Sequence, residues 1–220
     1  MLSVMTNNAS NIAQNAVTKN NDLLSNAMER LSTGLRINSA ADDAAGLQIA
    51  TRLNANVTGM ETASRNVADA TSMLQTADGA LDELSNIATR QKELATQAAN
   101  GVNSTKDMAA LDAEYKALNA EANRIIDSTE YGGNKLFTTL DGGVDFQIGA
   151  STSEKLTVTT TAAADIKSLF VGDLADQTKA VAQIDNVDAI IDAVGAERSN
   201  LGASINRLGH TASNLTNVTE

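Results

Sequence analysis

Residues 60–84, METASRNVADATSMLQTADGALDEL, carry the pattern that decides the fold. Apolar side chains recur there at alternating spacings of three and four residues, which is the a/d seam of a coiled coil. The seam lasts for more than three heptads and consists of Met60, Ala63, Val67, Ala70, Leu74, Ala77, Leu81 and Leu84. This spacing predicts a long helix that packs along its length against other helices.

The pattern predicts three long helices, over about residues 45–99, 104–128 and 178–219. The first ends near Asn100-Gly101, and the second begins at a capping-box-like Ser104-x-x-Asp107. The second seam is Met108, Leu111, Tyr115, Leu118, Ala122 and Ile125. The third is Ile184, Val187, Ile191, Val194, Arg198, Leu201, Ile205, Leu208, Ala212 and Leu215. Arg198 is the one polar member, and its stem can lie along the seam while its head reaches water or a carboxylate.

Two other regions follow different patterns. Residues 131–161 alternate apolar with polar side chains and contain turn sequences, which predicts a β-hairpin region. A short connector over 162–177 has room for a helical turn. At the other end, residues 4–34 carry a weak apolar stripe diluted by asparagine, so this helix would be marginal alone and is expected to need a partner.

We therefore predict a mainly α fold: an elongated antiparallel helical bundle or coiled-coil rod with a small β-hairpin region and an additional N-terminal helix. The domain boundary is expected at 44/45, with residues 1–44 forming the N-terminal helix and joint and residues 45–220 the rod. A helix of roughly 40 residues spans about 60 Å. No proline occurs in the 220 residues to interrupt such helices.

Composition argues against several function classes. The formal charge of −11 and the absence of a basic stripe argue against nucleic-acid binding, and no membrane-inserting stretch is visible. With no cysteine and a single histidine, His210, neither a metal centre nor a nucleophile–base pair can be drawn. No cofactor and no enzymatic activity are expected.

The stretch 31–53, LSTGLRINSAADDAAGLQIATRL, contains the most concentrated set of candidate site residues. Asp42 and Asp43 are adjacent, so on a helix they would point about 100° apart and could not converge on one substrate atom or metal. They are interpreted either as capping acids for the helix that follows or as polar contacts between subunits. Gly46 and its alanine neighbours would allow close approach of another backbone.

The chain resembles bacterial flagellin through MERLSTGLRINSAADDAAGLQIATRL, and the likeness continues through RNVADATSMLQTADGALDE, LATQAANGVNS, NRIIDSTEYGGNKLF and GAERSNLGASINRL. The resemblance implies a subunit of the extracellular flagellar filament, exported unfolded through the flagellar type III apparatus and self-assembling into a homopolymer. It implies that the N-terminal helix lies in an inner layer of the filament, and that outer variable domains are lacking. The subunit contacts expected from it are Arg30, Leu31, Arg36, Asn38, Asp42, Asp43, Gly46 and Leu47.

A second surface is implied by the same resemblance. Arg90, Leu94, Gln97 and Glu114 match positions through which flagellins bind the innate receptor Toll-like receptor 5. The first three lie at spacings of four and three residues and so share one helical face, which Glu114 could join from a neighbouring antiparallel helix. Packing between subunits is the alternative role for this face.

The sequence departs from flagellins at its end, where family members continue through a further helix. Self-assembly of residues 1–220 alone and binding of the export chaperone are therefore expected to be lost. The alternatives left open are a hook–filament junction protein and a secreted coiled-coil adaptor or effector.

Overall fold

The computed structural model describes residues 7–160 and 163–219, and it contains two compact units, Met1–Asn56 and Val57–Glu220. Helix α2, Ala44–Ala98, begins in the first unit and continues into the second. The domain boundary predicted at 44/45 thus coincides with the start of α2, whereas the compact units divide within that helix. Residues 44–56 contribute no buried side chain, which is why they do not cluster with the second unit.

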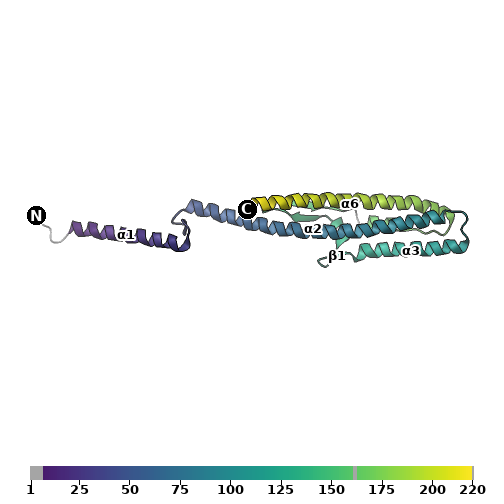
Figure 1. The fold of residues 1–220 in the computed structure, drawn as a ribbon, viewed down its shortest axis with the longest axis horizontal. Helices are drawn as coiled ribbons and strands as arrows, with labels where there is room; N and C mark the ends of the chain where they lie inside the picture. Colours follow the sequence, from purple (N-terminus) through teal and green to yellow (C-terminus); the bar gives the residue numbers. More distant parts are fainter. Residues whose placement is uncertain (1–6, 161–162, 220) are drawn as a thin grey trace. The chain divides into compact units, whose positions relative to one another are not determined.

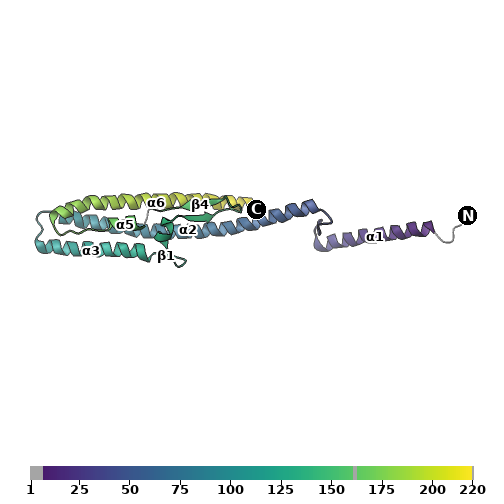
Figure 2. The same ribbon diagram turned by 180° about the vertical axis from the view of Figure 1, so that it is seen from behind.

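The second unit is a bundle of three helices: α2, α3 (Thr105–Ser128) and α6 (Gln177–Thr219). Figures 1 and 2 show α6 along one side of α2 and α3 along the other. Arg90 of α2 contacts Glu114 of α3 at 2.8 Å, and Arg198 of α6 contacts Asp78 of α2 at 2.9 Å. Lys92 of α2 forms an ion pair with Asp188 of α6, so contacts farther along α2 meet earlier residues of α6. Helix α2 therefore runs antiparallel to α6, and Figure 1 shows the same for α3, which follows α2 after a short turn.

The predicted seam of α2 is the centre of the core. Every member from Ala63 to Leu84 is buried, and Met60 is half-buried. Beyond the seam, Ala88, Gln91, Leu94, Ala95 and Ala98 are also buried. The buried face of α2 is wider than a two-stranded seam because two helices, α3 and α6, pack against it.

The seams of α3 and α6 are buried largely as predicted, but at two positions of each helix the neighbouring residue is buried instead. Asn119 and Ile126 are buried where Leu118 and Ile125 were expected, since a helix of 3.6 residues per turn rotates away from a strict heptad. In α6 the sequence predicted Arg198 as the polar residue of the seam. The buried residue there is its neighbour Glu197, which is only 1% exposed. Arg198 lies at the edge, where its guanidinium contacts Asp78 and Asp82 at 2.9 and 2.7 Å.

Two small antiparallel hairpins follow α3. Strands β1 (Glu130–Tyr131) and β2 (Asn134–Lys135) flank Gly132 and Gly133, both of which have positive φ. Strands β3 (Val144–Gln147) and β4 (Lys155–Val158) pair from Val144↔Val158 to Gln147↔Lys155. Between the hairpins lies helix α4, Leu136–Asp141, which the prediction of a β-hairpin region over 131–161 did not include. Its buried Leu136, Phe137 and Leu140 anchor it to the core as a short amphipathic turn.

The connector contains α5, Ala163–Leu169, and then returns to α6 through a segment held by side-chain hydrogen bonds. Asn119 donates to the carbonyl of Gly172 at 3.2 Å, and the backbone N–H of Leu174 donates to Asp112 at 2.8 Å. Phe170 and Leu174 are buried. This segment is therefore part of the folded unit. Residues 161 and 162, which the prediction assigned to the hairpin region and the connector, lie outside the described residues.

The first unit contains α1, Asn8–Thr33, and the joint that leads to α2. Asn7 caps the helix by accepting a hydrogen bond from Ser10 N–H at 3.2 Å. Gly34 ends it in the left-handed conformation with φ 72°, and its N–H donates to the carbonyl of Arg30 at 2.9 Å. Residues 4–6, where the helix was expected to start, lie outside the described residues. A search of the described helices finds none that is both long and apolar enough to cross a membrane.

Candidate functional site

Asp42 organises the turn that follows α1. Its carboxylate accepts hydrogen bonds from the backbone N–H groups of Asn38 and Ser39 at 3.1 and 3.0 Å, and from the Ser39 hydroxyl at 3.1 Å. Arg30 of α1 lies 3.9 Å away. These donors, led by the Asn38 N–H, hold the pKa of Asp42 below its ordinary value. Asp42 thus holds the turn between residues 38 and 42.

Asp43 is the N-cap of α2. Its side chain accepts a hydrogen bond from the backbone N–H of Gly46 at 2.8 Å, which satisfies one of the donors left over at the start of the helix. A Cβ atom at Gly46 would lie 2.5 Å from the Asp43 carboxylate and 2.9 Å from the side chain of Ile37, so both side chains would have to shift to admit a larger residue. The capping role predicted for the two acids is therefore present, although it is divided between the turn and the helix.

The joint also forms a small groove with a volume of about 390 Å³. Its lining residues are Leu35, Arg36, Ile37, Gly46, Leu47 and Ala50. Ile37 and Leu47 are half-buried, whereas Leu35 remains 61% exposed. The groove thus has an apolar base formed by Ile37 and Leu47, and the exposed side chain of Leu35 lies beside it.

Helix α1 leaves its apolar side chains in solvent. None of its described residues is buried, and Leu31 is 86% exposed. Five further large apolar side chains on α1 are each more than half exposed: Ile12, Val17, Leu23, Leu24 and Met28. At 100° per residue these side chains fall on one side of the helix. A continuous exposed apolar stripe of this kind marks an interaction surface.

The residues predicted as subunit contacts all lie in this first unit. Arg30, Asn38, Asp42, Asp43 and Gly46 are engaged in the hydrogen bonds, ion pair and close packing of the joint itself. The other three contribute to the exposed stripe or the groove: Leu31, Arg36 and Leu47. Ser39 and Ile37 were not singled out from the sequence, and the Ser-x-x-Asp spacing of Ser39 and Asp42 was the available signal.

The second predicted surface lies on α2 and α3. The Arg90 guanidinium contacts Glu93 and Glu114 at 2.8 Å each, which brings Glu114 onto the same face as predicted. These carboxylates, Glu93 first, raise the pKa of Arg90. Leu94, however, is only 1% exposed and packs in the core. Leu94 therefore lies in the core and not on the exposed face that Arg90 and Glu114 form.

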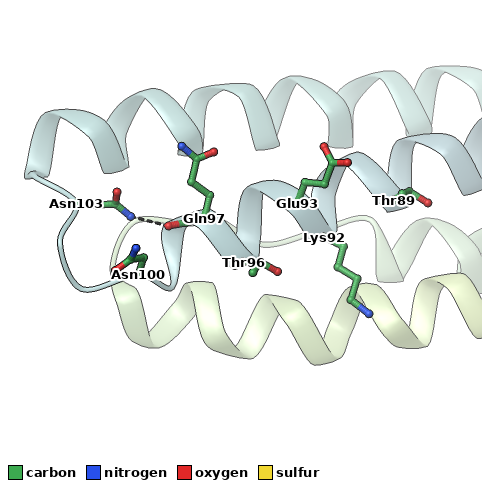
Figure 3. A pocket seen from close by; sticks show the side chains of 7 residues that line it. All are labelled: Thr89, Lys92, Glu93, Thr96, Gln97, Asn100 and Asn103. Carbon is green, nitrogen blue, oxygen red and sulfur yellow. Dashed lines mark hydrogen bonds between the residues drawn. The ribbon is translucent and has the colours of Figure 1, made fainter.

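Next to Arg90, a groove of about 640 Å³ runs over the end of α2. Figure 3 shows the seven residues that line it, Thr89, Lys92, Glu93, Thr96, Gln97, Asn100 and Asn103. Gln97 and Glu93 point toward the side on which α3 lies, whereas Lys92 points toward α6. Lys92 forms an ion pair with Asp188. The groove is open and is lined by polar residue types. Within the described residues no three His, Asp or Glu side chains are placed to hold a metal ion.

Buried polar groups tie the helices together. Gln91 donates from Nε2 to Asn119 at 2.7 Å, and the Tyr115 hydroxyl donates to Gln183 at 3.0 Å. Burial raises the pKa of Tyr115 to about 12. The sequence pattern did not show that Gln91 and Asn119 pair.

A heptad-packed bundle, joined to a helix whose apolar side chains are all exposed, defines a helical structural protein. The bacterial flagellin N-terminal helical region matches residues 4–141. A flagellin of Halalkalibacterium halodurans is 44% identical over 88% of this chain and 72% of its own length. Polar flagellin F of Vibrio parahaemolyticus is 47% identical over 71% of this chain, which spans 42% of that protein.

Solved structures agree with the sequence comparisons. The crystal structure of Bacillus cereus flagellin matches with a TM-score of 0.63 at 33% identity, covering 69% of this chain and 88% of that one. A Vibrio parahaemolyticus protein assigned to the flagellar hook-associated class has a TM-score of 0.53 at 14% identity, over 82% of this chain and 92% of its own, and shares the fold alone. The chain belongs to the bacterial flagellin family, the structural subunits of the flagellar filament.

Proposed function

We propose that the first unit is the assembly element through which this filament subunit contacts its neighbours. In this proposal the apolar stripe of α1 packs against helices of other subunits. The joint sets the direction in which the chain leaves α1 and enters α2. The predicted contacts Leu31, Arg36 and Leu47 touch neighbouring subunits, whereas Arg30, Asn38, Asp42, Asp43 and Gly46 keep the joint in shape.

The observation that carries this proposal is the exposure of α1. Complete burial of a Leu, Ile, Val or Met side chain stabilises a protein by about 1.5–3 kcal/mol. The six large apolar side chains of α1 could therefore contribute on the order of 10 kcal/mol to assembly before the entropic costs of association are subtracted. An isolated helix of 26 residues rich in asparagine has little stability of its own, so a partner both orders and covers it.

The test compares two substitutions that each introduce a negative charge on α1. They are made in cells whose only flagellin is encoded by the reading frame of this chain. Leu31→Asp places a carboxylate in the apolar stripe, whereas Ser25→Asp places the same group outside the stripe, about 120° around the helix from Leu31. We expect Leu31→Asp to abolish filaments in electron micrographs and Ser25→Asp to leave them. Normal filaments from Leu31→Asp would refute the proposal.

The proposal extends to how the subunit reaches the filament. We propose export in an unfolded state through the flagellar type III apparatus, to which the absence of cysteine and therefore of disulfides is suited. The proposed role is mechanical and includes no enzymatic activity. Intracellular accumulation of this chain in a strain lacking the flagellar export gate, with secretion in its parent, is the expected result.

A second candidate function is recognition by Toll-like receptor 5. It is favoured by the ion pair that joins Arg90 of α2 to Glu114 of α3, since this pair builds one exposed face from two helices. Gln97 extends the face toward the end of α2. The buried position of Leu94 assigns it a supporting role, in which it holds α2 against its neighbours beneath that face.

A reporter-cell assay tests this role with Arg90→Ala and Gln97→Ala. Arg124→Ala is the matched control because Arg124 is also an exposed arginine and pairs with Glu121 at 2.6 Å on α3. We expect the first two variants to lower receptor activation by about tenfold or more, equivalent to about 1.4 kcal/mol. Unchanged activation by both, or an equal loss with Arg124→Ala, would contradict the proposal.

The hook–filament junction role is the weaker alternative. Hook-associated proteins share this fold at 14% identity, whereas flagellins match the chain at 44–47%. Immunogold labelling of producing cells separates the two, because a filament subunit labels the whole filament and a junction protein only its base.

A further inference from the structure

The turn between α2 and α3 contains Asn100-Gly101, which is the only asparagine followed by glycine in the chain. Asparagine is chemically labile where the backbone nitrogen of the next residue can reach its side-chain carbonyl carbon. Glycine favours this attack because it has no Cβ to hinder approach. We propose that Asn100 is a site of spontaneous deamidation in the folded protein, independent of the functions proposed above.

The turn geometry favours the attack. The Asn100 Oδ1 atom accepts a hydrogen bond from the backbone N–H of Val102 at 3.3 Å, which folds the side chain back over the Asn100–Gly101 peptide. Asn100 is exposed. Within the described chain, neither its Nδ2 group nor the N–H of Gly101 donates to a protein acceptor. Figure 3 shows the Asn100 side chain at the end of the groove, clear of the hydrogen bond between Asn103 and Gln97.

Two other asparagines, Asn103 and Asn38, are followed by serine, and in both the reacting groups donate hydrogen bonds that the corresponding groups of Asn100 and Gly101 do not make. Asn103 donates from Nδ2 to the carbonyl of Gln97 at 2.6 Å, and the N–H of the following Ser104 donates to Asp107 at 3.0 Å. At the joint, the N–H of Ser39 donates to Asp42 at 3.0 Å, and Asn38 Nδ2 donates to the Leu35 carbonyl at 3.4 Å. These two sites therefore serve as internal controls.

The reaction requires only water. The backbone nitrogen of Gly101 attacks Cγ of Asn100, forming a C–N bond of a five-membered succinimide. The Cγ–Nδ2 bond breaks, and ammonia leaves with the proton from the Gly101 nitrogen. Water then adds to either imide carbonyl and opens the ring, which gives aspartate or, with one additional methylene in the backbone, isoaspartate. Both products place a carboxylate in the groove that Glu93 and Gln97 also line.

Peptide mass mapping of the full chain tests this inference during incubation in mildly alkaline buffer. We expect conversion at Asn100 to be at least several-fold faster than at Asn103 or Asn38, with isoaspartate as the major product. Gly101→Ala should slow the reaction at Asn100 several-fold and leave Asn103 unchanged, with circular dichroism confirming that the variant is folded. Conversion at Asn103 or Asn38 as fast as at Asn100, or a rate unaffected by Gly101→Ala, would overturn it.

Denaturant gives a second test that does not depend on a variant. Unfolding releases the hydrogen bonds that restrain Asn103 and Asn38, so their rates should rise more than that of Asn100. An acceleration at Asn100 equal to or greater than theirs would show that the fold protects this residue, and it would contradict the proposal.

Discussion

At the scale of residues, two adjacent aspartates serve different backbone partners. Asp42 accepts from residues 38 and 39 before it in the chain, and Asp43 accepts from residue 46 after it. The sequence alone showed that they do not converge, because neighbouring side chains diverge on a helix. It could not show which N–H each accepts, since that choice depends on the conformation of the turn.

Removing the cap of α2 should loosen its first turn. Asp43→Ala removes the acceptor of the Gly46 N–H, and loss of an N-cap typically costs about 1 kcal/mol. We predict faster hydrogen exchange at the amides of residues 46 and 47, measured by NMR. Glu61→Ala, which removes an exposed acid from the interior of the same helix, should leave these amides unchanged. Equal exchange in all three proteins would refute the capping role.

The buried pair of Gln91 and Asn119 should show strong coupling. Asn119→Ala removes the acceptor of the Gln91 amide, and an unsatisfied buried polar group costs about 1–3 kcal/mol. Replacing both residues by Leu removes both polar groups, so we expect the double variant to be less destabilised than the sum of the two Leu single variants. Urea unfolding of the wild type, the two Leu single variants and the double variant measures this coupling. Strict additivity would mean that the hydrogen bond contributes nothing.

At the scale of elements, the heptad spacing predicted the helices but not how they share the core. The α2 seam from Ala63 to Leu84 is buried as predicted because it faces both neighbours. On α3, two successive spacings of four residues bring Asn119 into the core, because a helix of 3.6 residues per turn rotates away from a strict heptad. On α6 the heptad spacing is kept, but Ile190 and Glu197 are buried next to the predicted Ile191 and Arg198. Helix α4 was missed because its six residues are too few to show a period.

The capping box of α3 should make stability depend on pH. The Ser104 hydroxyl and backbone N–H donate to Asp107 and lower its pKa below the ordinary 3.8. Because the folded pKa is depressed, the contribution is complete above pH 3.8 and is lost as the pH falls through the lowered value. Asp107→Asn should therefore lower Tm at neutral pH, with a difference that shrinks on acidification.

Thermal unfolding monitored by circular dichroism from neutral pH downward measures this difference. Asp192→Asn, which neutralises an exposed acid on α6, is the control and should show little change with pH. A Tm difference for Asp107→Asn that stays constant through the acid range would contradict the assignment.

At the scale of the whole molecule, the two units differ in where their apolar side chains lie. The second unit has a continuous core that includes Leu74, Leu81 and Leu208, each with no exposed surface. Between residues 7 and 56, the first unit exposes nearly all of its large apolar side chains. The sequence predicted this contrast from the weak, asparagine-diluted stripe of the first helix. In the function proposed above, other copies of the chain cover these exposed side chains.

Hydrogen exchange followed by mass spectrometry tests the central claim most directly, comparing the monomeric chain with filaments isolated from producing cells. In the monomer, we predict rapid exchange over Asn8–Thr33 and slow exchange over the buried half of α2, residues 63–98. In the filament, Asn8–Thr33 should become protected by about a hundredfold or more, as expected for about 2.7 kcal/mol of added stability. Protection of α1 in the monomer equal to that of α2, or unprotected α1 in the filament, would contradict the account.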